Sequence, residues 1–237
     1  MKICVVGTGY VGLSLAVLLS QKYEVIAYDI SKDRIENINN KISPIKDADL
    51  ENYLQNKNLN LKSTNDKNEA YINANYIIVA TPTNYDVKTG SFDTSTVEQV
   101  ISDCMRINSG GLIVIKSTVP LGFTDNMRIK FKNKDIIFSP EFLRENKALY
   151  DNLYPSRVVI GSKSEKAINF GKLLLECSLK SENDIQFLKM ESKEAEAVKL
   201  FSNTFLAMRI SFFNELDSFA EIQNLSSEKI IEGVSAD

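Results

Sequence analysis

The chain has 237 residues, a length that suits one large domain or two modest ones. Hydrophobic residues make up 43% and charged residues 25%, proportions that are ordinary for a globular protein and exclude a disordered or fibrous chain. The formal net charge of -3, from 28 basic and 31 acidic residues, gives no electrostatic reason to bind nucleic acid or an anionic membrane. We therefore expect neither as a partner.

The sequence contains no histidine, which excludes histidine general bases, Ser-His-Asp and Cys-His nucleophiles, and histidine metal ligands. Its three cysteines, Cys4, Cys104 and Cys177, are far apart and form no C-x-x-C pair. Each stands among apolar residues, so we interpret them as buried small side chains rather than nucleophiles. This cysteine usage predicts a cytoplasmic protein without a metal site. No run of about 20 apolar residues, as a bilayer crossing requires, is found.

A strand, a glycine turn, a helix and a second strand follow one another at the start of the chain. Lys2 to Val6 is an apolar run headed by one lysine, which is typical of a parallel strand buried on both faces. The turn Gly7-Thr8-Gly9-Tyr10-Val11-Gly12 comes next, then a helix-like pattern from Leu13 to Ser20 and a strand from Glu24 to Tyr28. These elements predict a βαβ unit of about 30 residues.

The glycine turn has the G-x-G-x-x-G spacing of a dinucleotide site. In such a turn Gly7 makes the tight bend, Gly9 lets the backbone approach a pyrophosphate, and Gly12 allows the helix to pack closely on the strand. Asp29 follows Gly12 by 17 residues, at a strand end, where an acid binds the adenosine ribose. Because a carboxylate repels a 2′-phosphate, NAD is favoured over NADP. The basic residues Lys32 and Arg34 lie nearby in the sequence and argue against this preference.

Further strands alternate with helical patterns, which predicts an α/β fold with a doubly wound, parallel Rossmann-like sheet. A helix-like stretch runs from Thr94 to Met105, and the Asn- and Lys-rich stretch from Asn52 to Asn68 is interpreted as a solvated surface region. The additional strands are predicted at Tyr76–Ala80, Leu112–Lys116, Ile136–Phe138 and Val158–Ile160.

After residue 190 the pattern changes. Glu194 to Gln223 contains no glycine or proline and carries apolar residues at helical spacing, which predicts one long helix, followed by a short helix that ends at Gly233. We expect an NAD-binding domain over 1–190, and over 191–237 a long helix with the start of a further helical region. The helix is apolar on more than one side, which suggests a partner, through Phe201, Phe205, Phe212 and Phe213.

Polar side chains follow several predicted strands at their carboxyl ends, where α/β sheets bind ligands. Thr81-Pro82-Thr83 and Ser117-Thr118-Val119-Pro120 supply hydroxyl groups for a ribose, nicotinamide or substrate, or merely start turns before proline. Glu141 and Glu145 share a face if they lie on a helical turn, where paired carboxylates do proton chemistry or simply face solvent. Lys199 and Asn203, also four apart, suit an oxyanion site or an ordinary exposed helix face.

The order and length of six segments identify a family. They are GTGYVGLS from Gly7, ATPT from Ala80, KSTVPLG from Lys116, SPEFLRE from Ser139, ALYDNLYPSRVVIG from Ala148 and KLFSNTFLAMRISFFNEL from Lys199. Together they resemble the UDP-glucose 6-dehydrogenases of the UDP-glucose/GDP-mannose dehydrogenase family over essentially the whole chain. The stretch from Tyr150 to Arg157 resembles the short bacterial UDP-glucose enzymes more than relatives that act on UDP-N-acetylmannosamine or GDP-mannose.

The resemblance implies a cytoplasmic, homodimeric enzyme of polysaccharide biosynthesis that oxidises UDP-glucose to UDP-glucuronate with two NAD, through a cysteine thioester. It implies that Thr118 holds a water, that Glu141 activates water for thioester hydrolysis, and that Lys199 and Asn203 stabilise an oxyanion. Glu145 then contacts both cofactor and substrate, and Phe142 and Leu143 lie along the substrate. The positions that match the family's NAD site are Gly7, Gly9, Tyr10, Val11, Gly12, Asp29, Arg34, Thr83, Thr118 and Glu145.

One departure from the family pattern concerns activity. In the family, the nucleophilic cysteine, a catalytic aspartate and a UDP-binding domain follow the central helices, and the present sequence ends before them. We therefore expect an N-terminal portion that binds NAD and has no turnover alone. Two alternatives are part of a UDP-N-acetylmannosamine or GDP-mannose dehydrogenase, and a non-catalytic NAD-sensing domain.

Overall fold

The structure is a computed structural model and describes residues 1–87, 90–108 and 110–236. The chain divides into two compact units, Met1–Ala197 and Val198–Asp237. The first unit holds the sheets and most helices. The second holds most of α9 (Ser192–Ile222) and all of α10 (Ser227–Val234).

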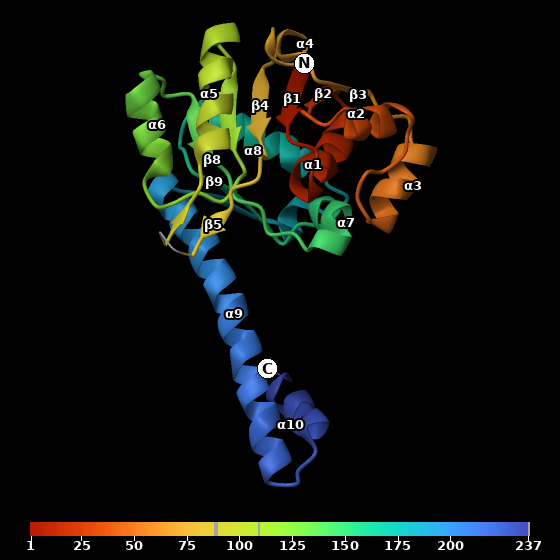
Figure 1. Ribbon diagram of the computed structural model, residues 1–237, viewed down its shortest axis with the longest axis vertical. Coiled ribbons are helices and arrows are strands. Elements are labelled where there is room, and N and C mark those ends of the chain that lie inside the picture. Colours follow the sequence, from red (N-terminus) through yellow and green to blue (C-terminus); the bar gives the residue numbers. More distant parts are fainter. Residues whose placement is uncertain (88–89, 109, 237) are drawn as a thin grey trace. The chain divides into compact units, whose positions relative to one another are not determined.

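A six-stranded parallel sheet with the strand order β3-β2-β1-β4-β7-β8 forms the centre of the first unit (Figure 1). The order reverses between β1 and β4, so the predicted doubly wound Rossmann-like fold is confirmed. The strands are β1 (Lys2–Val6), β2 (Glu24–Tyr28), β3 (Leu61–Thr64), β4 (Tyr76–Val79), β7 (Leu112–Ile115) and β8 (Ile136–Phe138).

Helices cover both faces of this sheet, because its strands carry apolar side chains on both sides. In β1, Ile3 and Val5 belong to one buried cluster with α1, α3, α7 and α8, while Cys4 and Val6 belong to a second cluster with α4, α5 and α6. The helices are α1 (Tyr10–Ser20), α2 (Lys32–Asn39), α3 (Ala48–Asn56), α4 (Lys67–Tyr71), α5 (Ser95–Ile107), α6 (Phe123–Phe131), α7 (Ala148–Leu153) and α8 (Glu165–Cys177), with short 3-10 turns η1 (Glu145–Lys147) and η2 (Glu182–Asp184).

The interpretation of residues 52–68 as a solvated surface region holds for most of its residues, which are exposed, but misses the buried positions and the strand within it. This stretch contains the end of α3 and the whole of β3, an edge strand that pairs with β2. Leu54 is 3% exposed and Ser63 is 2% exposed. The polar composition does not reveal this burial, because the polar groups form their hydrogen bonds inside the fold. The Ser63 hydroxyl donates to the carbonyl of Ala27, and the Asn39 side chain bonds both the N–H and the carbonyl of Ser63.

The strand expected at Val158–Ile160 forms as β9 (Arg157–Ile160), but outside the six-stranded sheet. It pairs in parallel with β10 (Gln186–Lys189), which the sequence pattern did not reveal, and a single bridge joins Phe138 to Gly161. The strands β5 (Tyr85–Asp86) and β6 (Ser91–Phe92) pair in antiparallel and form a separate two-stranded sheet.

The long helix expected at Glu194–Gln223 is confirmed as α9, which has 31 residues and is drawn as one continuous helix in Figure 1. Asn224 then adopts a left-handed conformation with φ 52°, and the Ser226 side chain accepts from the N–H of Lys229 to cap α10. Large apolar side chains of the second unit are exposed, among them Phe201, Phe205, Leu206, Met208, Ile210, Phe212 and Phe219. No helix in the described ranges is long and apolar enough for a bilayer crossing.

Candidate functional site

The glycine turn between β1 and α1 is glycine-rich for two different reasons. Gly7 has φ 92°, and a Cβ there would lie 2.5 Å from the carbonyl oxygen of Ala80. A Cβ on Gly12 would lie 1.8 Å from the carbonyl oxygen of Gly7. Gly9 differs, because a Cβ there would meet nothing within 4 Å. Packing therefore accounts for Gly7 and Gly12 but not for Gly9, whose position faces open space.

Gly9 is also the N-cap residue of α1, and no side chain caps this end of the helix. The first turn of α1 contains no acidic residue. The free N–H groups and the positive end of the helix dipole therefore face outward at the turn, an arrangement that suits a phosphate group. This is the arrangement that a pyrophosphate requires.

A cavity of about 760 Å³ lies on the β2 side of the turn. Of the predicted cofactor residues, Gly7, Gly9, Asp29 and Arg34 line it. Asp29 is 9% exposed and holds the turn itself: one carboxylate oxygen accepts from the N–H of Thr8 at 2.8 Å and from its hydroxyl at 2.5 Å, and the other accepts from the N–H of Ser31 at 2.9 Å.

Burial alone raises the pKa of Asp29, but the hydrogen bonds from Thr8 and Ser31 and the charge of Arg34 outweigh it, so the pKa lies below its usual value. The Arg34 guanidinium is 4.0 Å from the Asp29 carboxylate. Asp29 is therefore an ionised acceptor at neutral pH, as ribose recognition requires.

The far end of this cavity contains residues that sequence reasoning missed. Tyr28 and Tyr71 pack with ring centres 5.7 Å apart, and the Lys67 ammonium is 2.6 Å from the Asp103 carboxylate. The Tyr71 hydroxyl is buried and has no hydrogen-bond partner among the described residues. Burial raises the pKa of Tyr71. No motif marks these residues, since three different elements bring them together.

A second cavity, of about 480 Å³, lies on the β4 side of the turn and shares Gly9, Ala80, Thr81 and Pro82 with the first. It brings together most of the remaining predicted residues: Tyr10, Val11, Thr83, Thr118, Glu141, Leu143 and Glu145. The two cavities thus meet at Gly9, beside the reversal of strand order. Thr81 and Thr118 line cavities as predicted, while the Ser117 hydroxyl donates to the carbonyl of Thr81 at 2.6 Å and so serves the turn.

The condition that Glu141 and Glu145 share a helical turn is not met. Residues 141–144 form no helix, and Glu145 begins η1. The Glu141 carboxylate accepts from the N–H of Leu143 at 3.1 Å, and both Glu141 and Glu145 line the second cavity. Glu141 is half-buried and Glu145 is exposed. Their proximity therefore comes from a loop rather than from helical spacing.

Phe142, which was expected along a substrate, lines neither cavity. Its ring lies under the guanidinium of Arg157, 3.7 Å from the ring centre. Arg144 is held by Asp151, to which its backbone N–H and its guanidinium both donate. These contacts hold the loop just after Glu141.

Lys116 is another residue of the site that the sequence analysis did not identify. It follows β7, lines the second cavity and is 5% exposed. Its ammonium group donates to the Ser139 hydroxyl at 3.0 Å, and that hydroxyl donates to the carbonyl of Val159 at 2.9 Å. A lysine directly after four buried strand residues was the available signal.

Lys199 and Asn203 lie one turn apart on α9, in the second unit, as predicted. Lys199 is 6% exposed, and Asn203 is exposed. Gly12, the last predicted cofactor residue, packs behind the turn and lines neither cavity.

The three cysteines are buried and unbridged, as the sequence predicts. Burial raises the pKa of the Cys104 thiol to about 12 and that of the Cys177 thiol to about 11. It also raises the pKa of Cys4, with the neighbouring Cys104 adding to the effect. Within the described ranges no group of three or more His, Cys, Asp or Glu residues is placed to hold a metal ion.

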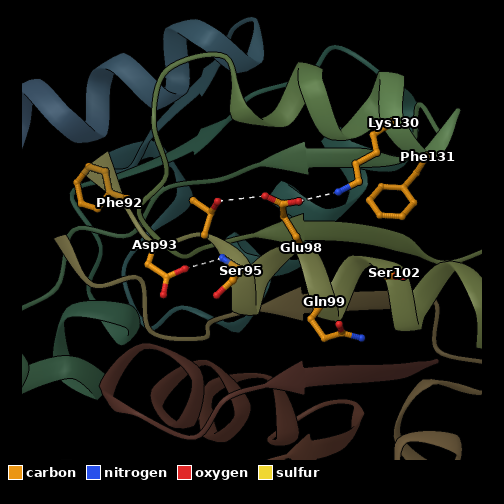
Figure 2. Close-up of a pocket in the computed structure, with 9 residues that line it drawn as sticks. Phe92, Asp93, Ser95, Glu98, Gln99, Ser102, Lys130 and Phe131 are labelled. Atoms are coloured by element: carbon orange, nitrogen blue, oxygen red, sulfur yellow. Dashed lines mark hydrogen bonds and ion pairs between the residues drawn. The ribbon is translucent and has the colours of Figure 1, made fainter. Parts of the chain in front are cut away.

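A third cavity, of about 550 Å³, lies between α5 and α6 and contains none of the predicted residues. Figure 2 shows the Lys130 side chain pointing at Glu98, and the two charged groups are 2.7 Å apart. The hydroxyl of Thr94 bonds the other carboxylate oxygen at 3.3 Å. Glu98 and Lys130 are thus paired with each other, while Asp93 accepts from the N–H of Ser95.

Comparisons with known proteins agree with this geometry. Residues 1–177 match the NAD binding domain of the UDP-glucose/GDP-mannose dehydrogenase family, and residues 193–237 match its central domain. A UDP-glucose 6-dehydrogenase of Streptococcus pneumoniae is 51% identical over the whole chain, which covers 61% of that protein. One of Campylobacter jejuni is 50% identical over the whole chain, which covers 60% of it. The chain thus spans about 60% of the length of these relatives.

Solved structures give the same assignment. A GDP-mannose dehydrogenase from Pseudomonas aeruginosa superposes with a TM-score of 0.89 at 26% identity, over 100% of this chain and 57% of that one. A UDP-glucose dehydrogenase from Pyrobaculum islandicum superposes with a TM-score of 0.87 at 30% identity, over 100% and 56%. With its glycine turn, two adjoining cavities and matching domains, the chain belongs to the UDP-glucose/GDP-mannose dehydrogenase family.

Proposed function

We propose that this chain is the NAD-binding portion of a UDP-glucose 6-dehydrogenase. The observation that carries the proposal is the opening at Gly9, where two cavities meet over an uncapped helix start at the point where the strand order reverses. That point is where doubly wound sheets bind dinucleotides. The match of residues 1–177 to an NAD binding domain supports NAD as the cofactor.

In this proposal the pyrophosphate lies at Gly9 and the adenosine ribose bonds Asp29, so the adenosine half occupies the first cavity. The nicotinamide half then occupies the second cavity, with Tyr10, Val11 and Thr83 along it. The ionised, partly buried carboxylate of Asp29 fits the two ribose hydroxyls and repels a 2′-phosphate. The residues present therefore fit NAD.

NAD, when bound, supplies the acceptor for a hydride from the sugar C6 alcohol, and two such transfers take the alcohol to a carboxylate. The chain's own residues hold and activate the other reactants. We assign Thr118 to hold a water, and Glu141 to take a proton from the water that hydrolyses the thioester. We assign Glu145 to contact both cofactor and sugar, and Leu143 to contact the sugar.

Lys199 and Asn203 are assigned to the oxyanion, since an ammonium and an amide one helical turn apart present donors on the same side. Phe142 keeps its assignment beside the substrate as a proposal, although its ring packs under Arg157. The exposed phenylalanines Phe201, Phe205 and Phe212, together with other apolar side chains of α9, support a homodimer through that helix.

The thioester requires a reactive thiolate, and none of Cys4, Cys104 and Cys177 provides one, because burial raises the pKa of each. We therefore propose that the nucleophile lies in a segment corresponding to the remaining 40% or so of the relatives' length. The 237-residue chain alone then binds NAD but leaves UDP-glucose unchanged.

UDP-glucose is proposed over the other sugars of the family because relatives named for it reach 50% and 51% identity. A GDP-mannose dehydrogenase and a UDP-N-acetylmannosamine dehydrogenase of known structure are 26% and 27% identical. A non-catalytic NAD sensor is the weaker alternative, since it has no use for the carboxylates of Glu141 and Glu145 in the second cavity.

Two measurements test the proposal. Calorimetric titration of the chain should show NAD binding, and binding weaker by at least tenfold for NADP; no heat at millimolar NAD contradicts it. The chain joined to the C-terminal part of the Streptococcus pneumoniae relative should reduce NAD with UDP-glucose but not with UDP-N-acetylmannosamine or GDP-mannose. In that joined chain, Lys199→Ala should lower kcat by on the order of a hundredfold.

A further inference from the structure

Glu196 is a fully buried carboxylate near the start of α9, within the first unit. One of its oxygens accepts from the N–H of Gly122 at 2.5 Å, and the other accepts from the N–H of Thr124 at 2.8 Å. Within the part of the chain that the structure describes, it forms no ion pair with a lysine or an arginine. A buried charge is costly unless it is hydrogen-bonded, so the two N–H groups at the positive end of α6 compensate it.

The loop of residues 117–122 connects β7 to α6 and carries Thr118, which lines the second cavity. At the start of the loop, the Ser117 hydroxyl donates to the carbonyl of Thr81 at 2.6 Å. At its end, the N–H of Gly122 donates to Glu196. Thr118 therefore lies between two fixed points, one of which is supplied by α9.

The end of this loop depends on a contact from outside it. Gly122 has φ 84°, and glycine both enters and leaves this left-handed region at little cost because it has no side chain. The helix α6 begins at the next residue, and Gly122 provides no side-chain cap for it. Glu196 thus fixes a position that the loop's own residues leave free to move.

We propose that Glu196 is a positioning residue for the cofactor, because it holds the end of the loop and so keeps Thr118 in place at the second cavity. The proposal rests on the proposed function, in which the nicotinamide half of NAD occupies that cavity and the adenosine half occupies the first. Glu196 lines neither cavity, so it acts through the loop and not by touching NAD. Its effect is therefore confined to the nicotinamide half.

The size of the effect follows from the fraction of molecules in which the loop has its binding arrangement, since the apparent Kd is the intrinsic Kd divided by that fraction. If loss of both hydrogen bonds leaves the loop in this arrangement about a tenth of the time, the Kd for NAD rises about tenfold. ADP carries only the adenosine and the pyrophosphate. No residue of 117–122 lines the first cavity, so the Kd for ADP should not depend on the loop.

The first measurement is calorimetric titration of parent and variants with NAD and with ADP. Glu196→Ala should raise the Kd for NAD about tenfold and keep the Kd for ADP within about twofold of the parent. Glu196→Gln retains one acceptor oxygen and should raise the Kd for NAD only about threefold. An equal rise for both ligands, or a rise for neither, overturns the inference. Failure of the parent to bind either ligand contradicts the proposed function instead.

A matched control separates position from stability. Leu175 in α8 is 6% exposed and lines neither cavity, so Leu175→Ala destabilises the fold by leaving a space in the core far along the chain from the loop. It should leave the ratio of the NAD Kd to the ADP Kd at the parent value. If Leu175→Ala raises this ratio as much as Glu196→Ala does, lost stability explains both results and the inference is overturned.

The second measurement needs no variant, so it does not depend on any substituted chain folding. Amide hydrogen exchange of the unmodified chain is compared with NAD and with ADP, each at the same multiple of its Kd. NAD should slow exchange at the N–H groups of Gly122 and Thr124 at least about threefold more than ADP does, because only NAD reaches the cavity that the loop borders. The N–H of Leu175 should slow equally with both ligands. Equal slowing at Gly122 and Thr124 overturns the inference.

Discussion

The Glu196 carboxylate accepts a hydrogen bond from the backbone N–H of Thr124 at 2.8 Å, inside a fully buried contact. Its other oxygen accepts from the N–H of Gly122 at 2.5 Å, so one side chain of α9 satisfies the N–H of the N-cap residue and the second N–H of α6. Gly122 has φ 84° and brings no side chain of its own to cap the helix. The loop that carries Thr118 leads directly into this capped helix start.

Glu196→Ala should therefore lower the free energy of unfolding by about 3 kcal/mol, because two buried N–H groups lose a charged acceptor. Glu196→Gln should recover about half of this loss, since an amide retains one acceptor oxygen. Urea unfolding followed by circular dichroism measures both. Glu36→Ala, at an exposed position of α2, is the control and should change stability by less than about 0.5 kcal/mol. Parent-like stability of Glu196→Ala contradicts the capping role.

Gly9→Ala and Gly12→Ala should affect different properties, NAD affinity and stability respectively, although both add one methyl group to the same turn. At Gly9 the methyl group meets nothing within 4 Å, so the fold persists, but NAD affinity falls at least tenfold because the methyl group stands where a pyrophosphate approaches. At Gly12 it overlaps the carbonyl of Gly7, so the unfolding free energy drops by more than about 3 kcal/mol. Thermal unfolding and NAD titration separate the two; unchanged NAD affinity in Gly9→Ala is the contrary result.

Asp29→Asn should weaken NAD by tenfold to a hundredfold, since a neutral amide replaces a charged acceptor for the ribose hydroxyls. The variant should also lose most of the discrimination against NADP, because the repulsion of a 2′-phosphate is gone. Titrations of parent and variant with both cofactors measure this. NADP binding to the parent more tightly than NAD would show that Lys32 and Arg34, rather than Asp29, decide the preference.

Stability should fall as the pH is lowered from neutral. The pKa of Asp29 is lowered because hydrogen bonds from Thr8 and Ser31 outweigh burial, and that of Asp103 because the bond from Lys67 outweighs burial. A carboxyl with a lowered folded pKa stabilises the fold above its unfolded pKa of about 4, and this stabilisation is lost as pH falls through the folded value. Urea midpoints should thus hold steady from about pH 7 to 5 and decline below about pH 4. Asp29→Asn should make the decline shallower.

The native cysteines should resist alkylation. With pKa values of about 12 for Cys104 and about 11 for Cys177, fewer than about one thiol in a hundred is ionised at pH 8. Iodoacetamide at pH 8 should label the folded chain at least a hundredfold more slowly than the chain in urea. Rapid labelling of one cysteine in the folded protein would revive it as a candidate nucleophile and weaken the argument that the chain has no turnover.

The sequence by itself determined the βαβ unit, the long helix and the dinucleotide turn, because each depends on neighbours in the chain. A buried strand needs a continuous apolar run, and the turn leaves no room for a side chain at Gly7 or at Gly12. The order of motifs also identified the family, which the domain matches confirm. The roles of individual site residues remain predictions.

Only the tertiary structure decided which residues face one another. The polar stretch around Ser63 becomes a strand because β2 offers it an edge, and no local apolar pattern announces such pairing. Glu141 and Glu145 reach one cavity through a loop rather than through the helical spacing that their separation suggested. Lys116 becomes a buried charge because Ser139, Pro140 and Phe170, all more than twenty positions away in the sequence, surround its ammonium group. Burial of a charge depends on distant segments, so its physical effect is decided only when the chain has folded.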